Sequence, residues 1–472
     1  MSESPSIEVD TLDDVRRVLA AAPEELRTLG LREVVRGRGA ITTLLSVLER
    51  LGAGGHPRVT VLSDTTPKRY GDGDVLDVAL EALSSVPRDV VFVAPDESNG
   101  AVLANTTTIT AALGAVRESR PEVLVSVGSG TIVDIGKVIS HDLSIPHVVV
   151  QTAASVNGFA DDQSVLLIDG VKRTTPSQWP SALIIDPGVV AEAPRAMNRS
   201  GLGDELSMFS AGADWYLAWA AGIDPTFSAT VTALMRKGVD DVLREADNLG
   251  YGEPHAVTQL ASLLMVSGLS MGVAGRTAPS SGSEHLVSHL LEMRADAESI
   301  SSASHGSQVG VASVLALLVW RRVRDHLRTG RGHLNLDHLA PKDQVITAFS
   351  RLDPSGAAAE ECWRDYEIKA SWIRQHPSQI ESMLETWPEH DRAVEGLLRP
   401  AVTVASALRR AQAPVTFAQL DPPPTPEVVT WAVANSHRMR NRFTIFDLAE
   451  LLGLWGEDDV TDVLAEQEGL TQ

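Results

Sequence analysis

The hydrophobic pattern of the sequence changes near Asp186, and this change constrains the fold more than any other feature. Before it, short β-branched runs alternate with amphipathic stretches; after it, apolar residues recur at helical spacing. The runs are VTVLSD (59–64), DVVFVAP (89–95), EVLVSVG (122–128), PHVVVQ (146–151) and ALIID (182–186). Such alternation predicts a parallel sheet with right-handed crossover helices.

We therefore expect three parts in the chain. These are an acidic N-terminal extension (1–30), an α/β nucleotide-binding domain (31–190) and an all-α domain (191–472). Within the last part, the segment DPPPTPEVV (421–429) predicts a loop that leads into a helix, because Thr425 can cap a helix whose first turn holds Pro426.

Composition excludes several functions. The chain has 40 Lys and Arg against 62 Asp and Glu, a net charge of −22, which argues against nucleic acid as the main partner. The single cysteine, Cys362, cannot form an internal disulfide, so we expect a cytoplasmic protein. The longest apolar run, near Val309 to Trp320, is shorter than the roughly 18 residues that span a bilayer, so no membrane span is expected.

A glycine-containing turn is the candidate nucleotide site. Gly128, Ser129, Gly130 and Thr131 follow a predicted strand and open a predicted helix. The free N–H groups of such a turn, with the helix dipole, can bind a pyrophosphate. Many α/β turns carry two glycines without a ligand, so that alternative stays open.

Asp64 ends an early predicted strand, where a carboxylate can accept hydrogen bonds from a ribose diol. It would repel a 2′-phosphate, which favours NAD over NADP, although Lys68 and Arg69 nearby weaken that distinction. A solvated turn aspartate is the alternative.

Four residues of the helical half form a candidate metal site: Asp204 in GLGDELS, His285 and His289 in SGSEHLVSHLLEM, and His305 in SHGSQVG. A spacing of four places His285 and His289 on one helix face. One carboxylate with imidazoles suits Zn²⁺, Fe²⁺ or Ni²⁺, though such histidines can also be structural. A serine hydrolase or zincin is disfavoured, because no G-x-S-x-G elbow follows a predicted strand and the chain has E-H-x-x-x-H instead of H-E-x-x-H.

These segments, in this order, resemble the iron-containing alcohol dehydrogenase superfamily and its sn-glycerol-1-phosphate dehydrogenase branch. VGSGTIVDIGK is similar to the glycine-rich nucleotide turn of that family, and QTAASVNGFAD is similar to its T-A-A-S-x-D-G segment. GLGDELSMFSAGADW, SGSEHLVSHLLEM and HGSQVG resemble its metal segments, and SHRMRNRFTIFDL resembles its closing I-R-D-R-Y-T-I-L-D stretch. The resemblance runs from Leu31 to Leu448.

The resemblance implies a dehydroquinate-synthase-like architecture, a homo-oligomer, and a role for each matched residue. Asp204, His285 and His305 would ligate one divalent metal, with zinc favoured over nickel or iron, and His289 would face the substrate. Contacts to NAD or NADP would come from Gly128, Ser129, Gly130, Thr131, Ile132, Thr152 and Ser155.

Two residues depart from the family pattern. Asn157 stands where the family has a substrate-contacting Asp, and Asp161 stands where it has a nucleotide-contacting Ser. Since an amide offers donors that a carboxylate lacks, a substrate hydroxyl can be held differently by Asn157.

The implied activity is metal-dependent hydride transfer between a nicotinamide and a phosphorylated polyol ketone, with dihydroxyacetone phosphate and sn-glycerol 1-phosphate as the expected pair, or with another polyol or cyclitol. A sugar-phosphate cyclase of the dehydroquinate-synthase type is one alternative. A relative that binds NAD and metal without turnover is another, motivated by Asn157 and Asp161.

Overall fold

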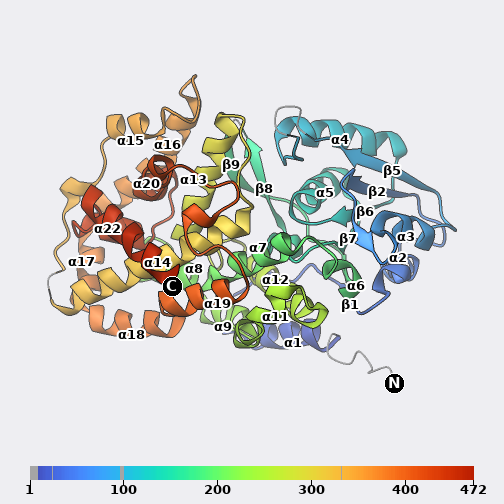
Figure 1. The fold of residues 1–472 in the computed structure, drawn as a ribbon, viewed down its shortest axis with the longest axis horizontal. Helices are drawn as coiled ribbons and strands as arrows, with labels where there is room; N and C mark the ends of the chain where they lie inside the picture. The colour runs from blue at the N-terminus through green and yellow to red at the C-terminus, as the bar shows by residue number, and fades with distance from the viewer. Residues whose placement is uncertain (1–8, 24, 96–99, 169, 331, 472) are drawn as a thin grey trace. The chain divides into compact units, whose positions relative to one another are not determined.

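The computed structural model describes residues 9–23, 25–95, 100–168, 170–330 and 332–471, which form two compact units (Figure 1). The first unit takes in the described residues up to Ile168, then 172–201 and 233–276, and the second takes in 170–171, 202–232 and the chain from Thr277 onward. This division differs from a single boundary after residue 190. Helix α12 (Pro254–Ala274) packs against α6 (Pro187–Val190) and the short 3-10 helix η2 (Gly158–Ala160), which places 233–276 in the first unit.

The first unit is built on a parallel sheet with the order β1-β10-β7-β6-β2-β5 among the described strands. The bounds are β1 (Glu33–Arg36), β2 (Val59–Asp64), β5 (Arg88–Val93), β6 (Val123–Gly128), β7 (His147–Gln151) and β10 (Ala182–Ile185). All five strands predicted from the sequence are confirmed.

Five of the described strands lie outside the prediction. Strand β1 is a short edge strand whose residues are all only partly buried, so its apolar signal is small. Two separate two-stranded sheets also form: β3 (Arg69–Tyr70) pairs antiparallel with β4 (Gly73–Asp74), and β8 (Gln163–Ile168) pairs with β9 (Val171–Pro176).

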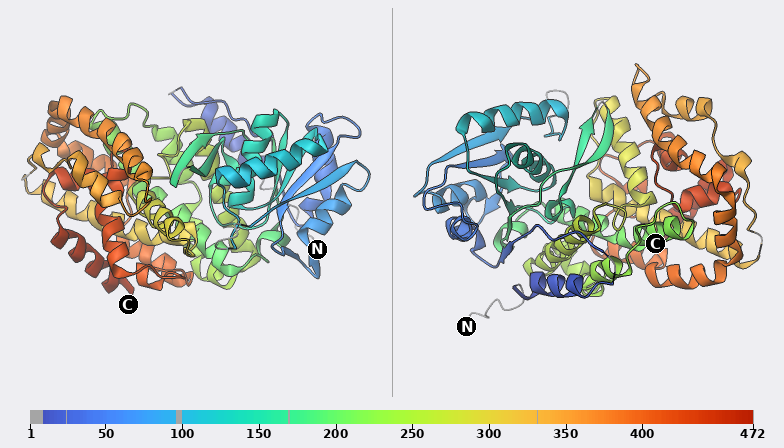
Figure 2. Two further views of the ribbon diagram at one scale, coloured as in Figure 1. Left: turned by 90° about the horizontal axis from the view of Figure 1, so that it is seen from above. Right: turned by 180° about the vertical axis from the view of Figure 1, so that it is seen from behind.

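Alternation along β6 explains how the sheet is covered. Val123, Val125 and Val127 belong to one core cluster with residues of α2 (Leu44–Arg50) and α3 (Val75–Ala82). Leu124 belongs to another, with residues of α4 (Thr106–Ser119) and α5 (Gly130–Leu143). Because successive side chains of a strand point to opposite faces, helices cover the sheet on both sides (Figure 2).

The remaining helices of the first unit are α1 (Val9–Ala20), η1 (Ala40–Thr43), α10 (Val239–Arg244) and α11 (Ala246–Tyr251). The chain passes between the units within α7 (Arg195–Leu206) and α9 (Ala229–Met235), and again between Arg276 and Thr277. Among the described helices, α12 alone has the length and composition of a membrane span, and 83% of its most apolar window is buried inside the protein. A core helix of a folded domain has the same features.

The second unit is helical, as predicted. Its helices are α8 (Met208–Ala220), α13 (Ser283–Ala297), α14 (His305–Arg328), α15 (Lys342–Phe349), α16 (Ala357–Gln375), α17 (Pro377–Glu385), α18 (Trp387–Leu397), α19 (Ala401–Arg410), α20 (Pro426–Asn435), α21 (Ile445–Leu451) and α22 (Glu457–Glu468), with short turns η3 (Leu336–His338), η4 (Phe417–Gln419), η5 (Ser436–Met439) and η6 (Gly469–Thr471). Helix α14 is largely buried and packs against α8, α13, α19, α21 and α22. The predicted start of α20 is confirmed, because the Thr425 side chain accepts a hydrogen bond from the Val428 N–H.

Candidate metal and nucleotide sites

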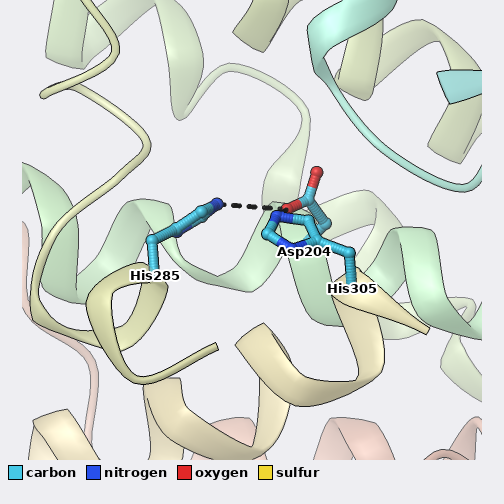
Figure 3. A group of neighbouring side chains, drawn as sticks. All are labelled: Asp204, His285 and His305. Carbon is cyan, nitrogen blue, oxygen red and sulfur yellow. Dashed lines mark ion pairs between the residues drawn. The ribbon is translucent and has the colours of Figure 1, made fainter. Parts of the chain in front are cut away.

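Asp204, His285 and His305 meet in the second unit, as the sequence predicts. They come from α7, α13 and the first residue of α14, and their ligand atoms lie within 4.8 Å of one another. Figure 3 shows the three side chains pointing toward one another. Oδ1 of Asp204 lies 3.4 Å from Nε2 of His285 and 3.9 Å from Nε2 of His305. One oxygen and two nitrogens therefore face a common point.

The start of α13 is held by two buried carboxylates. Glu284 accepts a hydrogen bond from the Gly282 N–H (2.5 Å) and Asp214 accepts one from the Ser283 N–H (2.7 Å). Asp214 also accepts hydrogen bonds from the Ile445 N–H and from the indole of Trp320. The bonds from Gly282 and Ser283 satisfy N–H groups at the start of α13 that have no partner within the helix, and they fix the turn that carries His285.

The other ring nitrogen of each histidine ligand faces α13. Nδ1 of His285 lies 3.0 Å from Oε1 of Glu284. Nδ1 of His305 lies 3.2 Å from Oγ of Ser288 and 3.3 Å from Oε1 of Glu292. Partners at Nδ1 leave Nε2 of both rings for a metal, which is the usual arrangement around histidine ligands.

The site favours a positive charge. Burial lowers the pKa of His285, but the carboxylates of Asp204 and Glu284 outweigh it and raise that pKa to about 9. Burial raises the pKa of Glu284, yet hydrogen bonds from His285, Ser210 and the Gly282 amide bring it below its usual range. A cluster with two carboxylates and convergent imidazoles fits a divalent cation.

His289 lies beside both histidine ligands. Its ring centroid is 5.9 Å from that of His285 and 5.5 Å from that of His305, onto which it stacks. His289, Glu292 and His305 form a second group of potential ligands, and their ligand atoms also lie within 4.8 Å of one another. His305 belongs to both groups. Its Nε2 faces Asp204 and its Nδ1 faces Glu292.

The predicted nucleotide turn lies in the first unit. Gly128 ends β6, Ser129 is the N-cap of α5, and Gly130, Thr131 and Ile132 form the first turn of that helix. The Thr152 N–H donates to the Gly128 carbonyl (3.1 Å), which joins the ends of β6 and β7.

The sheet topology supports a ligand site at this edge. From β2 the chain crosses to β5 on one side, and then to β6 and β7 on the other. The order therefore reverses between β2 and β6, and such a switch point is where parallel α/β sheets bind ligands. Asp64 and Gly128 end these two strands.

The segment after β7 is held firmly. Ser155 and Asn157 are both buried, and Asn157 is the residue before η2. The side chain of Asn198 accepts a hydrogen bond from the Ala154 N–H (3.0 Å). A Cβ atom on Gly268 would overlap the Asn157 carbonyl oxygen, so only glycine permits this approach of α12.

Two predicted cofactor residues have protein partners. Asp64 forms an ion pair with Lys68 and accepts a hydrogen bond from the Thr66 hydroxyl. Asp161 is buried and accepts a hydrogen bond from Lys137 (2.8 Å). Burial raises the pKa of Asp161 to about 6 against the opposing effect of Lys137. Direct contacts of these carboxylates with a nucleotide stay predictions.

Sequence reasoning did not find Glu284, Glu292 or Lys137. Glu284 directly precedes His285, and Glu292 follows His289 by three residues on the same helix. A carboxylate within one turn of a candidate histidine ligand was the available signal. Lys137 is in the family-like segment VGSGTIVDIGK, but its partner Asp161 is distant in sequence.

Comparisons with known proteins agree with this fold and these motifs. Residues 35–194 match the family model for iron-containing alcohol dehydrogenase. A glycerol-1-phosphate dehydrogenase from Geobacillus stearothermophilus is 28% identical over 425 residues, covering 89% of this chain and 93% of that protein. The enzymes of the same name from Pyrococcus furiosus and Halobacterium salinarum are both 30% identical, over 63% and 67% of this chain and 82% and 87% of their own lengths.

Solved structures share the fold at lower identity. A probable glycerol dehydrogenase from Sinorhizobium meliloti superposes with a TM-score of 0.59 and 17% identity, covering 94% of this chain and 99% of that one. Glycerol dehydrogenase from Schizosaccharomyces pombe gives 0.56 and 15%, over 93% and 90%. Together with the ordered motifs, these similarities show that the chain belongs to the iron-containing alcohol dehydrogenase superfamily, in its glycerol-1-phosphate dehydrogenase branch.

Proposed function

We propose that this enzyme is a metal-dependent NAD(P)-linked dehydrogenase that transfers hydride between a nicotinamide and a phosphorylated polyol ketone, with dihydroxyacetone phosphate and sn-glycerol 1-phosphate as the pair. The observation that supports it most is the convergence of Asp204, His285 and His305 in a member of this family. The names of the relatives, which are glycerol-1-phosphate dehydrogenases, support the choice of substrate.

The proposed role of the metal site is to polarise the carbonyl group of the substrate. A divalent ion, with zinc favoured over nickel or iron, supplies a Lewis acid for the carbonyl oxygen when it is bound. Asp204 and Nε2 of His285 and His305 would hold the ion. His289, whose ring lies next to both histidines, would orient a substrate hydroxyl or pass a proton through water.

The nucleotide side of the proposal rests on the first unit. The N–H groups of Gly130 and Thr131 at the start of α5 would bind the pyrophosphate, whereas the Ile132 N–H donates to the Ser129 carbonyl (3.0 Å). Thr152 and Ser155 would contact the dinucleotide, and Asn157 the substrate. NAD is the favoured cofactor because Asp64 ends β2, and its ion pair with Lys68 leaves NADP as a second cofactor.

Oxidation of NADH or NADPH, followed by nicotinamide absorbance, tests the proposal. The enzyme is stripped of metal, refilled with Zn²⁺, Ni²⁺ or Fe²⁺, and given dihydroxyacetone phosphate. We expect turnover only after refilling, and none in His285→Ala. A suitable control is His390→Ala, because His390 belongs to the same unit but hydrogen-bonds to Tyr216. Full activity in His285→Ala would refute the metal assignment.

The same assay separates the alternatives. Phosphate release without net change in NADH would indicate the cyclase. Binding of NAD and metal without oxidation of any tested polyol ketone or cyclitol would indicate a relative that has lost turnover. A cytoplasmic homo-oligomer stays our prediction, and light scattering of the purified chain measures the oligomeric state.

A further inference from the structure

We propose that Glu284 is a positioning residue for the metal, and that its carboxylate fixes the tautomer and orientation of the His285 ring so that Nε2 faces Asp204. This inference rests on the metal site of the proposed function. It concerns a residue that is not a ligand and that sequence reasoning did not select.

The two nitrogens of His285 face different groups. Oε1 of Glu284 lies 3.0 Å from Nδ1, and Oδ1 of Asp204 lies 3.4 Å from Nε2. When Nδ1–H donates to a carboxylate, the proton is kept at Nδ1 and the lone pair of Nε2 is left for the metal. Glu284 thus determines both where the proton lies and where the ring points.

Glu284 is itself held by groups other than His285. Its side chain is fully buried, Oε2 accepts a hydrogen bond from the Ser210 hydroxyl (2.7 Å), and Oε1 accepts one from the Gly282 N–H. A buried carboxylate needs such partners to offset its loss of solvation. The carboxylate is therefore preorganised by α8 and by the turn before α13, and it can impose its position on the imidazole.

Asp214 offers a matched comparison in the same unit. It is also buried and also holds the start of α13, but its carboxylate accepts hydrogen bonds from Ser283, Trp320 and Ile445. A variant at Asp214 disturbs the same helix start without removing the partner of His285 Nδ1. Comparing the two positions separates orientation of the ligand from general support of α13.

The test is the affinity of the full-length, metal-stripped chain for Zn²⁺, measured by competition with a chromophoric chelator. We expect Glu284→Gln to weaken Zn²⁺ binding about 10-fold and Glu284→Ala up to about 100-fold, the range for removing an outer-sphere partner of a histidine ligand. Asp214→Asn is expected to weaken Zn²⁺ binding by less than the roughly tenfold lower end of that range, whatever its effect on thermal unfolding.

Ser210→Ala provides a second variant that keeps the charge of Glu284. If Ser210 acts through Glu284, Ser210→Ala weakens Zn²⁺ binding in the unmodified chain and has no further effect in Glu284→Gln, as in a double-mutant cycle of coupled residues. The visible spectrum of the Co²⁺-loaded chain should also change in Glu284→Gln and remain unchanged in Asp214→Asn, because it reports ligand geometry.

The outcomes separate this inference from the proposed function. If the unmodified chain binds none of Zn²⁺, Ni²⁺ and Fe²⁺, the proposed function fails. If the chain binds Zn²⁺ and His285→Ala abolishes binding, while Glu284→Gln keeps the affinity and the Co²⁺ spectrum unchanged, only the role of Glu284 is overturned. Equal losses in Glu284→Gln and Asp214→Asn would overturn it as well.

Discussion

Gly203 of α7 and Gly306 of α14 lie backbone against backbone. A Cβ atom on Gly203 would overlap the Gly306 carbonyl oxygen, and a Cβ atom on Gly310 would lie 2.7 Å from Cα of Gly203. Asp204 directly follows Gly203, and His305 directly precedes Gly306. The close crossing of these helices is therefore what brings two of the metal ligands together.

Substitution of Gly203 by Ala should separate the two helices. We expect Gly203→Ala to lower the free energy of unfolding by about 1–3 kcal/mol, as in other overpacked cores, and to weaken Zn²⁺ binding. Gly396→Ala, on α18, is the control, because the added Cβ atom would have no neighbouring atom within 4 Å. The free energy of unfolding of that control should rise by about 0.8–1 kcal/mol, because Ala has the higher helix propensity. Equal Zn²⁺ affinities in the two variants would contradict the importance of this crossing.

Residues 333–400 include a buried cation, Lys369 of α16. Its Nζ donates to the carbonyl oxygens of His437 (2.6 Å) and Arg442 (2.9 Å) and pairs with Asp447 (2.5 Å). Arg442 in turn donates to the hydroxyls of Ser281 and Thr277, in the segment that precedes α13. This part of the chain thus supports the closing segment and, through it, the start of the metal-binding helix.

Lys369→Met should leave the carboxylate of Asp447 buried without its cation. Removing one partner of a buried ion pair destabilises a protein by about 3–5 kcal/mol, and we expect a loss of that size in chemical denaturation. Lys342 pairs with Glu360 at 3.0 Å, but both side chains are about half exposed. Lys342→Met should therefore change stability by less than about 1 kcal/mol. If Lys369→Met also lost less than about 1 kcal/mol of stability, the buried ion pair would contribute little.

The sequence predicts those features that depend on local periodicity. Helix α4 (Thr106–Ser119) is an example, because the residue before it, Asn105, is a helix-capping residue that can be read from the local sequence. The roles of Glu284 and Asp161 depend on residues distant in sequence, since Ser210 holds Glu284 and Lys137 holds Asp161. Polar contacts across such separations leave no periodic pattern in the sequence, so only the folded structure reveals them.

The buried histidine of β7 makes stability depend on pH. Burial, with a smaller effect from the charge of Lys137, lowers the pKa of His147 from 6.5 to about 3. Below pH 6.5 the imidazole of His147 is protonated in the unfolded chain but stays neutral in the folded chain until the pH approaches 3. The free energy of unfolding therefore falls as the pH falls from 6.5 toward 3. One such group contributes a slope of about 1.4 kcal/mol per pH unit in that window.

Unfolding of His147→Gln by denaturant between pH 7 and 4.5 tests this slope. We expect the variant to lose less stability per pH unit than the unmodified chain, whereas His141→Gln, at an exposed residue of α5, should behave like the unmodified chain. An unchanged slope in His147→Gln would assign the pH dependence to other groups.

Lys68 bears on the choice of nicotinamide cofactor. Its ion pair with Asp64, in which both side chains are largely buried, partly neutralises the carboxylate that would repel a 2′-phosphate. We expect Lys68→Ala to raise the preference for NADH over NADPH, measured as the ratio of kcat/KM values, by about tenfold, the scale of one partly screened charge. Arg58→Ala, at an exposed residue before β2 that pairs with Glu122, is the control. An unchanged ratio in Lys68→Ala would place the ribose away from Asp64.

The most direct test of the metal assignment is Zn²⁺ binding and Zn²⁺-dependent NADH oxidation with dihydroxyacetone phosphate in Asp204→Ala and Glu292→Gln, compared with the unmodified chain. Both carboxylates lie within 4 Å of His305, but only Asp204 also lies within 4 Å of His285 among the described ion pairs. We predict that Asp204→Ala abolishes binding and turnover, and that Glu292→Gln weakens binding about tenfold. Retention of Zn²⁺ and turnover in Asp204→Ala, with loss of both in Glu292→Gln, would contradict the assignment and place the ion with His289, Glu292 and His305.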